Sequence, residues 1–356
     1  MSSYLRDVIE GRRKGAGGLL TRGFLSLASV AYGALHAVHR SMYNMGLVRR
    51  IILPVPVISV GNITAGGTGK TPLVEWVARR LARRRLRVAV LARGYGRRID
   101  GGDDEDLLGD AEHIRRYADP DRVASARRAL AEFHPDAIVL DDGFQHYRLH
   151  RDLDLVAVDA TNPFGYGRLL PRGLLRDRPT ALRRAQGIVL TRTDQVTPAE
   201  LEALRSKIAA LSLDRPVAET VHRPVGVRTL TDNRTWGPDW VRGRRLYAFC
   251  GIGNPESFRR TVESAGAQVV KFRAYPDHHV YRPAEARQLE VEAQEFLAGA
   301  LITTEKDATK LDPSMFRLPV ATLRVELEAV RGGERLEAML ESAVRTPDPA
   351  IAASAP

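Results

Sequence analysis

The sequence contains very little cysteine. One residue, Cys250, stands alone among 356, and a single thiol forms neither an internal disulfide nor a multi-cysteine metal site. This composition favours a reducing compartment. Hydrophobic residues make up 44% and charged residues 27% of the chain, which is typical of a globular protein with ample core. The length suits two domains better than one.

Acidic residues are too few to balance the basic ones. The formal net charge is +11, with arginine far in excess of lysine. A bias in the base composition of the genome would explain part of the arginine excess. The charge indicates an anionic partner, which is a nucleic acid, a membrane surface or a phosphorylated substrate. No nucleic-acid partner is expected, because no basic stretch is interleaved with aromatic residues.

The N-terminal part has no clear membrane-spanning run. The apolar stretch at residues 24–38 is broken by Ser and Gly and falls short of the about 20 apolar residues that a spanning helix needs. No clean small-residue cleavage site follows, which disfavours a secretory signal. Basic residues flank the stretch, as in an interfacial helix on an anionic leaflet. The alternative is a helix that packs on the protein's own core. The two interpretations are compatible if one face of the helix packs on the core and the other contacts lipid.

Residues 56–71 carry the motif around which the chain is organised, Pro-Val-Ile-Ser-Val-Gly-Asn-Ile-Thr-Ala-Gly-Gly-Thr-Gly-Lys-Thr. The β-branched run at 57–60 predicts a buried strand, and apolar residues at helical spacing from residue 73 predict a helix. Strand, glycine loop, Lys-Thr and helix form the context of a phosphate-binding P-loop. A glycine-rich turn without a ligand is the alternative. One departure is Thr64, which stands where the first glycine of the P-loop pattern belongs.

The P-loop pattern assigns a role to each part of this stretch. Loop amides and the helix N-terminus would bind phosphate oxygens. Lys70 would reach the β- and γ-phosphates, and the Thr71 hydroxyl would ligate Mg²⁺. The predicted nucleotide-binding residues are Thr64, Ala65, Gly66, Gly67, Thr68, Gly69, Lys70 and Thr71.

A second motif, Asp-Asp-Gly-Phe-Gln-His at residues 141–146, directly follows an aliphatic run. This is the arrangement of a Walker-B strand. We predict that Asp141 binds Mg²⁺ directly or through water, with Asp142 beside it, because carboxylate oxygens suit this hard cation. The alternative to a metal site is a strand followed by an ordinary Asp-Gly turn, which is common for an isolated Asp-Gly. The P-loop upstream favours the metal site.

Further apolar runs at 87–92, 152–159 and 187–192 predict strands, and residues 198–213 predict a helix. Arg93 opens a basic, glycine-rich loop where phosphate would collect at a sheet edge, with a solvated turn as the alternative. Strands and helices alternate again from 246 to 310, which predicts a second α/β unit. The predicted fold is an α/β P-loop NTPase core with a mostly parallel twisted sheet, a smaller α/β domain and an N-terminal membrane-associated helix.

Together with Arg-Leu-Leu-Pro at residues 168–171, these motifs closely resemble those of the tetraacyldisaccharide 4′-kinases of lipid A biosynthesis. The resemblance runs from the N-terminal helix to about residue 325, and this family also lacks the first P-loop glycine. It implies ATP- and Mg²⁺-dependent phosphorylation of the 4′-hydroxyl of a lipid A disaccharide 1-phosphate. It also implies a place at the cytoplasmic face of the bacterial inner membrane, on its anionic lipids, and no obligate protein partner.

The resemblance also implies site residues. The family's catalytic aspartate lies in Gly-Asp-Glu-Pro followed by leucines, and Asp-Asp-Glu-Asp-Leu-Leu at 103–108 is similar, which puts that carboxylate on Asp104. A second register, Gly-Asp-Ala-Glu at 109–112, makes Asp110 the alternative. Within an Asp-His-His cluster, His278 would partner the catalytic aspartate across the cleft, and zinc is disfavoured there because no third ligand has a recognisable spacing. The residues implied to line the substrate or the transferring phosphate are Arg93, Arg122, His146, Arg176 and Asp177, where the family has Glu at the last position.

The expected organisation has five parts. Residues 1–50 form the membrane-associated segment, 51–215 the kinase core, 216–243 an aperiodic connection, 244–344 the smaller domain and 345–356 a disordered tail. Lys70, Asp142, Asp104 and His278 are the expected catalytic residues. The alternative function is a membrane-recruited P-loop switch of the GTPase or metallochaperone type. The role of the family-like motif Thr-Thr-Glu-Lys-Asp at 303–307 stays open, with a structural one at least as well supported.

Overall fold

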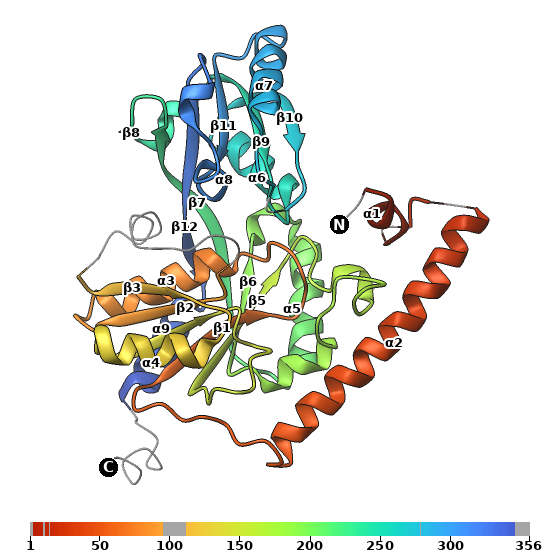
Figure 1. Cartoon of the computed structure of the whole chain (residues 1–356), viewed down its shortest axis with the longest axis vertical. Helices are drawn as coiled ribbons and strands as arrows, with labels where there is room; N and C mark the ends of the chain where they lie inside the picture. The colour runs from red at the N-terminus through yellow and green to blue at the C-terminus, as the bar shows by residue number, and fades with distance from the viewer. Residues whose placement is uncertain (1–2, 10, 14, 95–111, 278, 346–356) are drawn as a thin grey trace. The chain divides into compact units, whose positions relative to one another are not determined.

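The protein is described here by a computed structural model that covers residues 3–9, 11–13, 15–94, 112–277 and 279–345 (Figure 1). The chain divides into two compact units. Unit 1 comprises residues 1–220 and 329–356, and unit 2 comprises residues 221–328.

Unit 1 is built on a parallel sheet with the strand order β7-β6-β5-β1-β4-β2-β3. The strands are β1 (Val57–Asn62), β2 (Val88–Ala92), β3 (Ile114–Ala118), β4 (Ala137–Asp141), β5 (Leu153–Asp159), β6 (Gly187–Thr191) and β7 (Val217–Thr229). Every residue of β1, β2, β5 and β6 is buried. Their continuous apolar character is typical of parallel strands covered on both faces.

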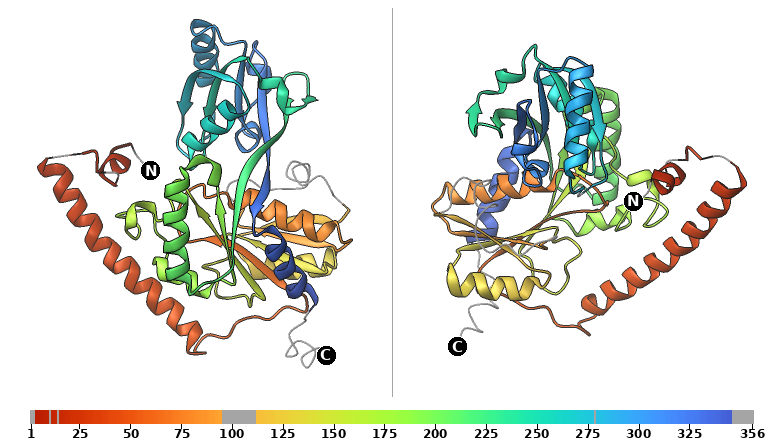
Figure 2. Two further views of the ribbon diagram at one scale, coloured as in Figure 1. Left: turned by 180° about the vertical axis from the view of Figure 1, so that it is seen from behind. Right: turned by 45° about the horizontal axis from the view of Figure 1, so that its top comes forward.

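Helices cover both faces of this sheet, as Figures 1 and 2 show. The helices of unit 1 are α1 (Ser3–Ile9), α2 (Ala16–Asn44), α3 (Lys70–Ala82), α4 (Arg122–Glu132), α5 (Pro198–Ser212) and α9 (Gly333–Arg345), with short 3₁₀ turns η1 (Gly165–Gly167), η2 (Pro179–Arg184) and η3 (Thr193–Gln195). The buried stripe of α4, including Val123 and Ala126, packs against Leu91 and Ile138. On the other face, α9 packs on α3 and joins it through the Arg80–Glu337 ion pair.

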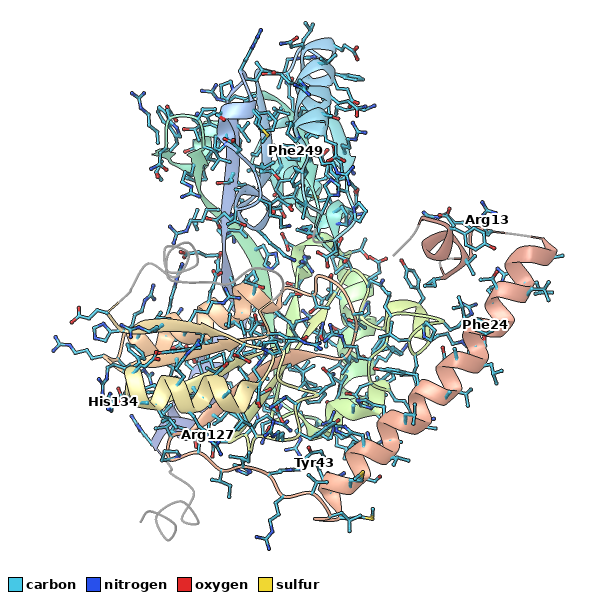
Figure 3. The ribbon with its side chains drawn as sticks, viewed as in Figure 1. Arg13, Phe24, Tyr43, Arg127, His134 and Phe249 are labelled. Atoms are coloured by element: carbon cyan, nitrogen blue, oxygen red, sulfur yellow. The ribbon has the colours of Figure 1, made fainter. Side chains whose placement is uncertain are left out.

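Helix α2 is much longer than the apolar run that the sequence indicates. It spans 29 residues and buries Gly18, Leu25 and Ser29. Its other large apolar side chains face outward: Phe24, labelled in Figure 3, and Leu27 are each 72% exposed. By length and composition the helix could cross a membrane. Core helices of soluble proteins and signal sequences meet the same two criteria.

Unit 2 contains a parallel sheet of β10, β9, β11 and β12, with β8 antiparallel to β7. Its strands are β8 (Arg234–Trp236), β9 (Arg245–Cys250), β10 (Gln268–Ala274), β11 (Ala300–Thr304) and β12 (Val320–Arg331). Its helices are α6 (Pro255–Ser264), α7 (Pro283–Glu295) and α8 (Glu305–Ala308), with the turns η4 (Pro238–Val241) and η5 (Pro313–Met315). The predicted fold class, a P-loop core with a mostly parallel sheet and a smaller α/β unit, is confirmed.

The unit boundaries differ from the expected ones in two places. Strands β7 and β8 occupy most of residues 216–243, which were expected to be an aperiodic connection. The chain then returns to unit 1 at residue 329, so that α9 belongs with the P-loop helix α3 rather than with unit 2. Arg, Pro and Thr interrupt the apolar alternation of β7, and the amphipathic pattern of α9 does not reveal which sheet it covers.

Candidate active site

The glycine loop between β1 and α3 is fixed by side chains from two strands. Asn62 Nδ2, at the end of β1, donates to the Thr64 carbonyl at 2.5 Å and to Thr68 Oγ1 at 2.9 Å. Thr191, at the end of β6, donates from Oγ1 to the Thr68 carbonyl at 2.9 Å. Gly69, with a φ of 81°, caps α3 in a left-handed conformation that favours glycine. The loop therefore has the strand-to-helix setting of a phosphate-binding site.

The structure explains why threonine stands at the first-glycine position. Thr64 forms an antiparallel bridge with Leu175, and the Ala65 amide donates to the Leu174 carbonyl at 2.6 Å. This part of the loop thus pairs in an extended conformation with residues 174–175. An extended backbone accepts a β-branched residue and needs no glycine.

Lys70, Asp142 and Arg176 form a charged group beside the loop. Lys70 Nζ lies 3.4 Å from Asp142 Oδ1, and Arg176 Nη1 donates to both oxygens of the same carboxylate at 2.8 and 2.7 Å. Burial lowers the pKa of the Lys70 ammonium, and Asp142 opposes that change. Burial also disfavours the charged form of Asp142, yet Lys70 and Arg176 hold its pKa below the ordinary value. The predicted residues Lys70, Asp142 and Arg176 therefore come together.

Asp141 lies at the carboxyl end of β4, which pairs with β1 in parallel register, Val60 opposite Asp141. Burial raises the pKa of its carboxyl group in spite of Arg116, whose Nη2 lies 3.7 Å from Asp141 Oδ2. Arg122, at the start of α4, is buried and donates to the backbone carbonyls of Asp119 and Asp141 at 3.0 and 3.1 Å. Asp141 is thus a partly buried carboxylate for which an additional nearby cation would favour ionisation.

His146 is held as a neutral imidazole. Burial, followed by the nearby charges of Arg122 and Arg151, lowers its pKa to about 4. Its backbone is fixed at both ends, because its amide donates to the Gly143 carbonyl at 2.8 Å and its carbonyl accepts from Arg151 at 2.5 Å. At neutral pH a neutral imidazole can donate one hydrogen bond and accept another but adds no charge to the site.

Asp177 lies in the interior of unit 1, and it also lines the pocket next to α2. It is 2% exposed. Gln145 Nε2 and Arg184 Nη2 each donate to Asp177 Oδ2 at 3.1 Å, and His36 Nδ1 of α2 lies 3.4 Å from Oδ1. This carboxylate joins three segments of unit 1, and its contacts are those of a structural hub.

Of the remaining predicted residues, two lie among the described residues and three do not. Arg93 directly follows β2 and is exposed, and Thr71 is the exposed second residue of α3. Asp104, Asp110 and His278 lie outside the described residues.

In unit 2, side chains of the Thr-Thr-Glu-Lys-Asp motif form hydrogen bonds with backbone amides. Thr304 Oγ1 accepts from the Asp307 amide at 3.1 Å and so caps α8. The fully buried Asp307 carboxylate accepts from the Gly251 amide at 2.9 Å and from Thr304 Oγ1 at 2.8 Å, and Lys310 Nζ lies 3.0 Å away. The described contacts of this motif are structural ones.

A pocket of about 550 Å³ opens between α2 and residues 167–179. Small and apolar residues of α2, such as Gly33 and Ala34, line one side. Arginines contribute much of its polar lining: Arg40, Arg168, Arg172, Arg176 and Arg178. A pocket with apolar and cationic walls suits a molecule that carries both hydrocarbon and negative charge.

Sequence reasoning missed several residues of this site. Asn62 and Gln145 lie inside the two recognised motifs, where the polar side chains next to the glycines were a usable signal. Tyr32 and His36 stand four residues apart on α2, and their rings stack at 5.9 Å. Their spacing places them on one helix face, but which segment that face meets depends on tertiary packing.

Comparisons with known proteins agree with these features. The sequence profile of the LpxK family, tetraacyldisaccharide-1-P 4′-kinase, matches residues 21–345. The tetraacyldisaccharide 4′-kinase of Anaeromyxobacter sp. (strain Fw109-5) is 40% identical, over 97% of this chain and 98% of that protein. The protein of the same name from Syntrophus aciditrophicus is 38% identical, over 85% and 88% of the two chains.

A solved structure leads to the same family. The crystal structure of LpxK from Aquifex aeolicus in complex with ATP has a TM-score of 0.67 and 27% sequence identity, and the match covers 91% of this chain and 99% of that one. These findings do not favour the alternative of a GTPase or metallochaperone-type switch. The chain is a kinase and belongs to the tetraacyldisaccharide 4′-kinase family.

Proposed function

We propose that this protein uses the P-loop of unit 1 to hold ATP and Mg²⁺ while its γ-phosphate passes to the 4′-hydroxyl of a tetraacylated disaccharide 1-phosphate. Phosphorylation in lipid A biosynthesis is the activity of the family to which the chain belongs. The charged group of Lys70, Asp142 and Arg176 beside the P-loop carries the proposal at the level of residues.

Lys70 and the loop amides bind the β- and γ-phosphates in this proposal. A phosphate oxygen that replaces Asp142 as the partner of Lys70 would meet a preformed cation, because Asp142 already holds the ammonium at 3.4 Å. Arg176 keeps the freed Asp142 carboxylate paired through its two short contacts. Charge is thus rearranged within the site rather than exposed to water.

The residues present fit Mg²⁺. Among the described residues, no group of three or more His, Cys, Asp or Glu side chains forms a complete metal cage. Mg²⁺ needs no such cage, since it keeps several waters and shares substrate phosphate oxygens. Thr71 and Asp141 would hold it. Desolvation raises the pKa of the partly buried Asp141 carboxyl group, and a bound cation would favour its ionised form. The ion would supply charge neutralisation between the phosphates.

Asp104 accepts the proton of the sugar hydroxyl in this proposal, and His278 orients its carboxylate. Both assignments come from the resemblance of residues 103–108 and 277–279 to family motifs. An imidazole that donates to a carboxylate would fix the direction of the accepting oxygen. Arg122, His146 and Arg93 would line the acceptor or the transferring phosphate.

Helix α2 and the adjoining pocket support a membrane location in this proposal. The outward apolar side chains of α2 and the arginine-rich wall of the pocket suit an anionic, acylated substrate taken from a lipid surface. We place the protein at the cytoplasmic face of the inner membrane, as a peripheral or monotopic enzyme.

Single substitutions test the base assignment. Asp104→Ala should lower kcat far more than it changes ATP affinity, because Asp104 contacts the acceptor hydroxyl and not the nucleotide. Asp110→Ala, at the alternative register, is the matched comparison and should retain most turnover. Unchanged turnover in Asp104→Ala together with a loss in Asp110→Ala would move the base to Asp110.

Vesicle flotation tests the membrane location. Replacing the exposed Phe24 and Leu27 by serine should reduce binding to vesicles that contain anionic phospholipid, since each removes exposed apolar surface. Replacement of Leu213, which is also exposed but lies at the end of α5, is the control. Equal binding of the α2 variant and the wild type would contradict a role for this face.

A further inference from the structure

We propose that Tyr32 and His36 of α2 are positioning residues for the nucleotide site, so that the membrane-facing helix also holds the P-loop and Lys70 in place. The inference rests on the proposed function of that site. It depends on two connected series of contacts that begin one helical turn apart on α2 and end at the two sides of the glycine loop.

The first series runs from Tyr32 to Lys70. The Tyr32 hydroxyl donates to the backbone carbonyl of Arg176 at 3.1 Å. The amide of Arg176 in turn donates to the Ile63 carbonyl in the glycine loop at 2.7 Å. Its guanidinium binds both oxygens of Asp142, which lies 3.4 Å from Lys70 Nζ. Tyr32 therefore fixes the backbone that aims the Arg176 side chain.

The second series runs from His36 to the glycine loop. His36 Nδ1 lies 3.4 Å from the buried carboxylate of Asp177. Gln145 Nε2 joins that carboxylate, at 3.1 Å, to the backbone carbonyl of Asn62, at 2.7 Å. The Asn62 amide group then holds Thr64 and Thr68, on either side of Gly66 and Gly67. Movement of Asp177 would therefore disturb the loop through two hydrogen-bonded side chains.

Both series of contacts start from the same part of α2. Tyr32 and His36 hold adjacent residues, Arg176 and Asp177, whose side chains point to different partners. Ser29, one turn earlier, accepts from the Arg172 amide at 3.0 Å and donates to the Leu169 carbonyl at 2.9 Å. A helix with mostly exposed side chains is thus seated through polar contacts on the segment that supports the phosphate site. A partly buried network of this kind loses hydrogen bonds if one member shifts.

Coupling between the helix seat and ATP follows from linkage. If the seated helix stabilises the ATP-binding geometry, removal of a seating contact weakens ATP binding, and bound ATP strengthens the seat by the same factor. A simple anchor has no such relation, because loss of an anchor changes membrane binding and leaves affinity for ATP unaltered. ATP affinity measured without lipid therefore separates the two roles.

The test uses the full chain and isothermal titration with ATP and Mg²⁺. Tyr32→Phe and His36→Gln should each raise the dissociation constant about fivefold, the effect of one net hydrogen bond. Tyr43→Phe is the matched control, because Tyr43 lies on the same helix and its ring, 5.9 Å from that of Tyr147, is kept. Its ATP affinity should equal that of the wild type. Unchanged affinity in both Tyr32→Phe and His36→Gln would overturn the inference.

A double-mutant cycle distinguishes positioning from general destabilisation. Tyr32 acts through the guanidinium of Arg176 in this account, so Tyr32→Phe should have no further effect on ATP affinity in an Arg176→Ala background. An undiminished effect in that background would contradict it. Failure of the proposed function has a different signature: ATP binding would respond as described, but no phosphate would reach the disaccharide lipid.

Discussion

Arg176 Nη1 lies 2.8 Å from Oδ1 and 2.7 Å from Oδ2 of Asp142, which makes this the closest pairing within the Lys70 group. The arginine follows the cis Leu170–Pro171 segment by a few residues, whereas the aspartate directly follows β4. Neither contact is local in sequence, so the charged group exists because the 168–177 loop folds back over the carboxyl ends of the strands.

Loss of Arg176 should impair catalysis. Arg176→Ala leaves the Asp142 carboxylate with Lys70 as its remaining described ion-pair partner, and kcat should fall about 100-fold, as for loss of a charged donor at a reacting phosphate. Arg176→Lys keeps the charge but not the planar group and should recover part of the loss. Arg183→Ala removes an arginine that binds the Leu211 carbonyl instead and serves as the control in the same lipid phosphorylation assay.

His146 should make stability depend on pH in the acidic range. Its pKa of about 4 lies below the unfolded value of 6.5, so the unfolded chain binds the proton more readily as the pH falls through this interval. The free energy of unfolding should decrease from pH 6.5 toward pH 4. In His146→Gln, which does not titrate, that decrease should be smaller. Urea denaturation across this pH range measures both, and identical slopes would show that His146 is not held neutral.

Helix α9 should stabilise the P-loop unit. Leu340 is 2% exposed, and its helix contacts α3 and β5, so Leu340→Ala should cost about 2–4 kcal/mol of unfolding free energy. Glu337→Gln in the same helix breaks a partly exposed ion pair with Arg80 and should cost about 1 kcal/mol or less. If urea denaturation gave equal losses for the two variants, α9 would not be packed as described.

Asp307 should stabilise unit 2. Gly251 and Thr304 both donate to Asp307 Oδ2, and Lys310 pairs with Oδ1. Asp307→Asn keeps the shape but removes the charge and replaces one of these two acceptor oxygens by an NH₂ group, which should cost about 1–3 kcal/mol. Asp312→Asn changes an exposed carboxylate that caps its own turn and should cost less. Thermal unfolding compares the two variants. Equal melting temperatures would contradict the stabilising role of Asp307.

Much of the fold could be read from local patterns. The apolar run at 57–60, the glycine loop and the helical spacing after residue 73 all belong to one contiguous segment, and the structure has β1, the loop and α3 in that order. Strand β3 escaped notice because Arg115 and Arg116 interrupt its apolar residues. Strand β7 escaped notice as well, because Arg, Pro and Thr interrupt its apolar alternation. Helix α9 has an amphipathic pattern, but its assignment to a unit depends on contacts far away in sequence.

The sequence predicted which residue types form the site, but it predicted less well which partners each of them contacts. Asp142 was expected near Mg²⁺ because it follows Asp141, and the structure shows it bound to Lys70 and Arg176. Asp177 was expected beside the substrate. It lines the pocket next to α2, and it also accepts from Gln145 and Arg184 and lies close to His36, contacts that its motif did not predict. Motif spacing identifies a side chain's chemistry, whereas tertiary packing decides which group it meets.

The most direct test follows phosphate from ATP into the acceptor. Purified protein is incubated with γ-labelled ATP, Mg²⁺ and a detergent-dispersed tetraacyl disaccharide 1-phosphate, and the product is examined for the labelled position. The account predicts label at the 4′ position, a requirement for the lipid and a loss of transfer in Lys70→Ala. Hydrolysis of nucleotide without transfer to the lipid, or a preference for GTP, would contradict it.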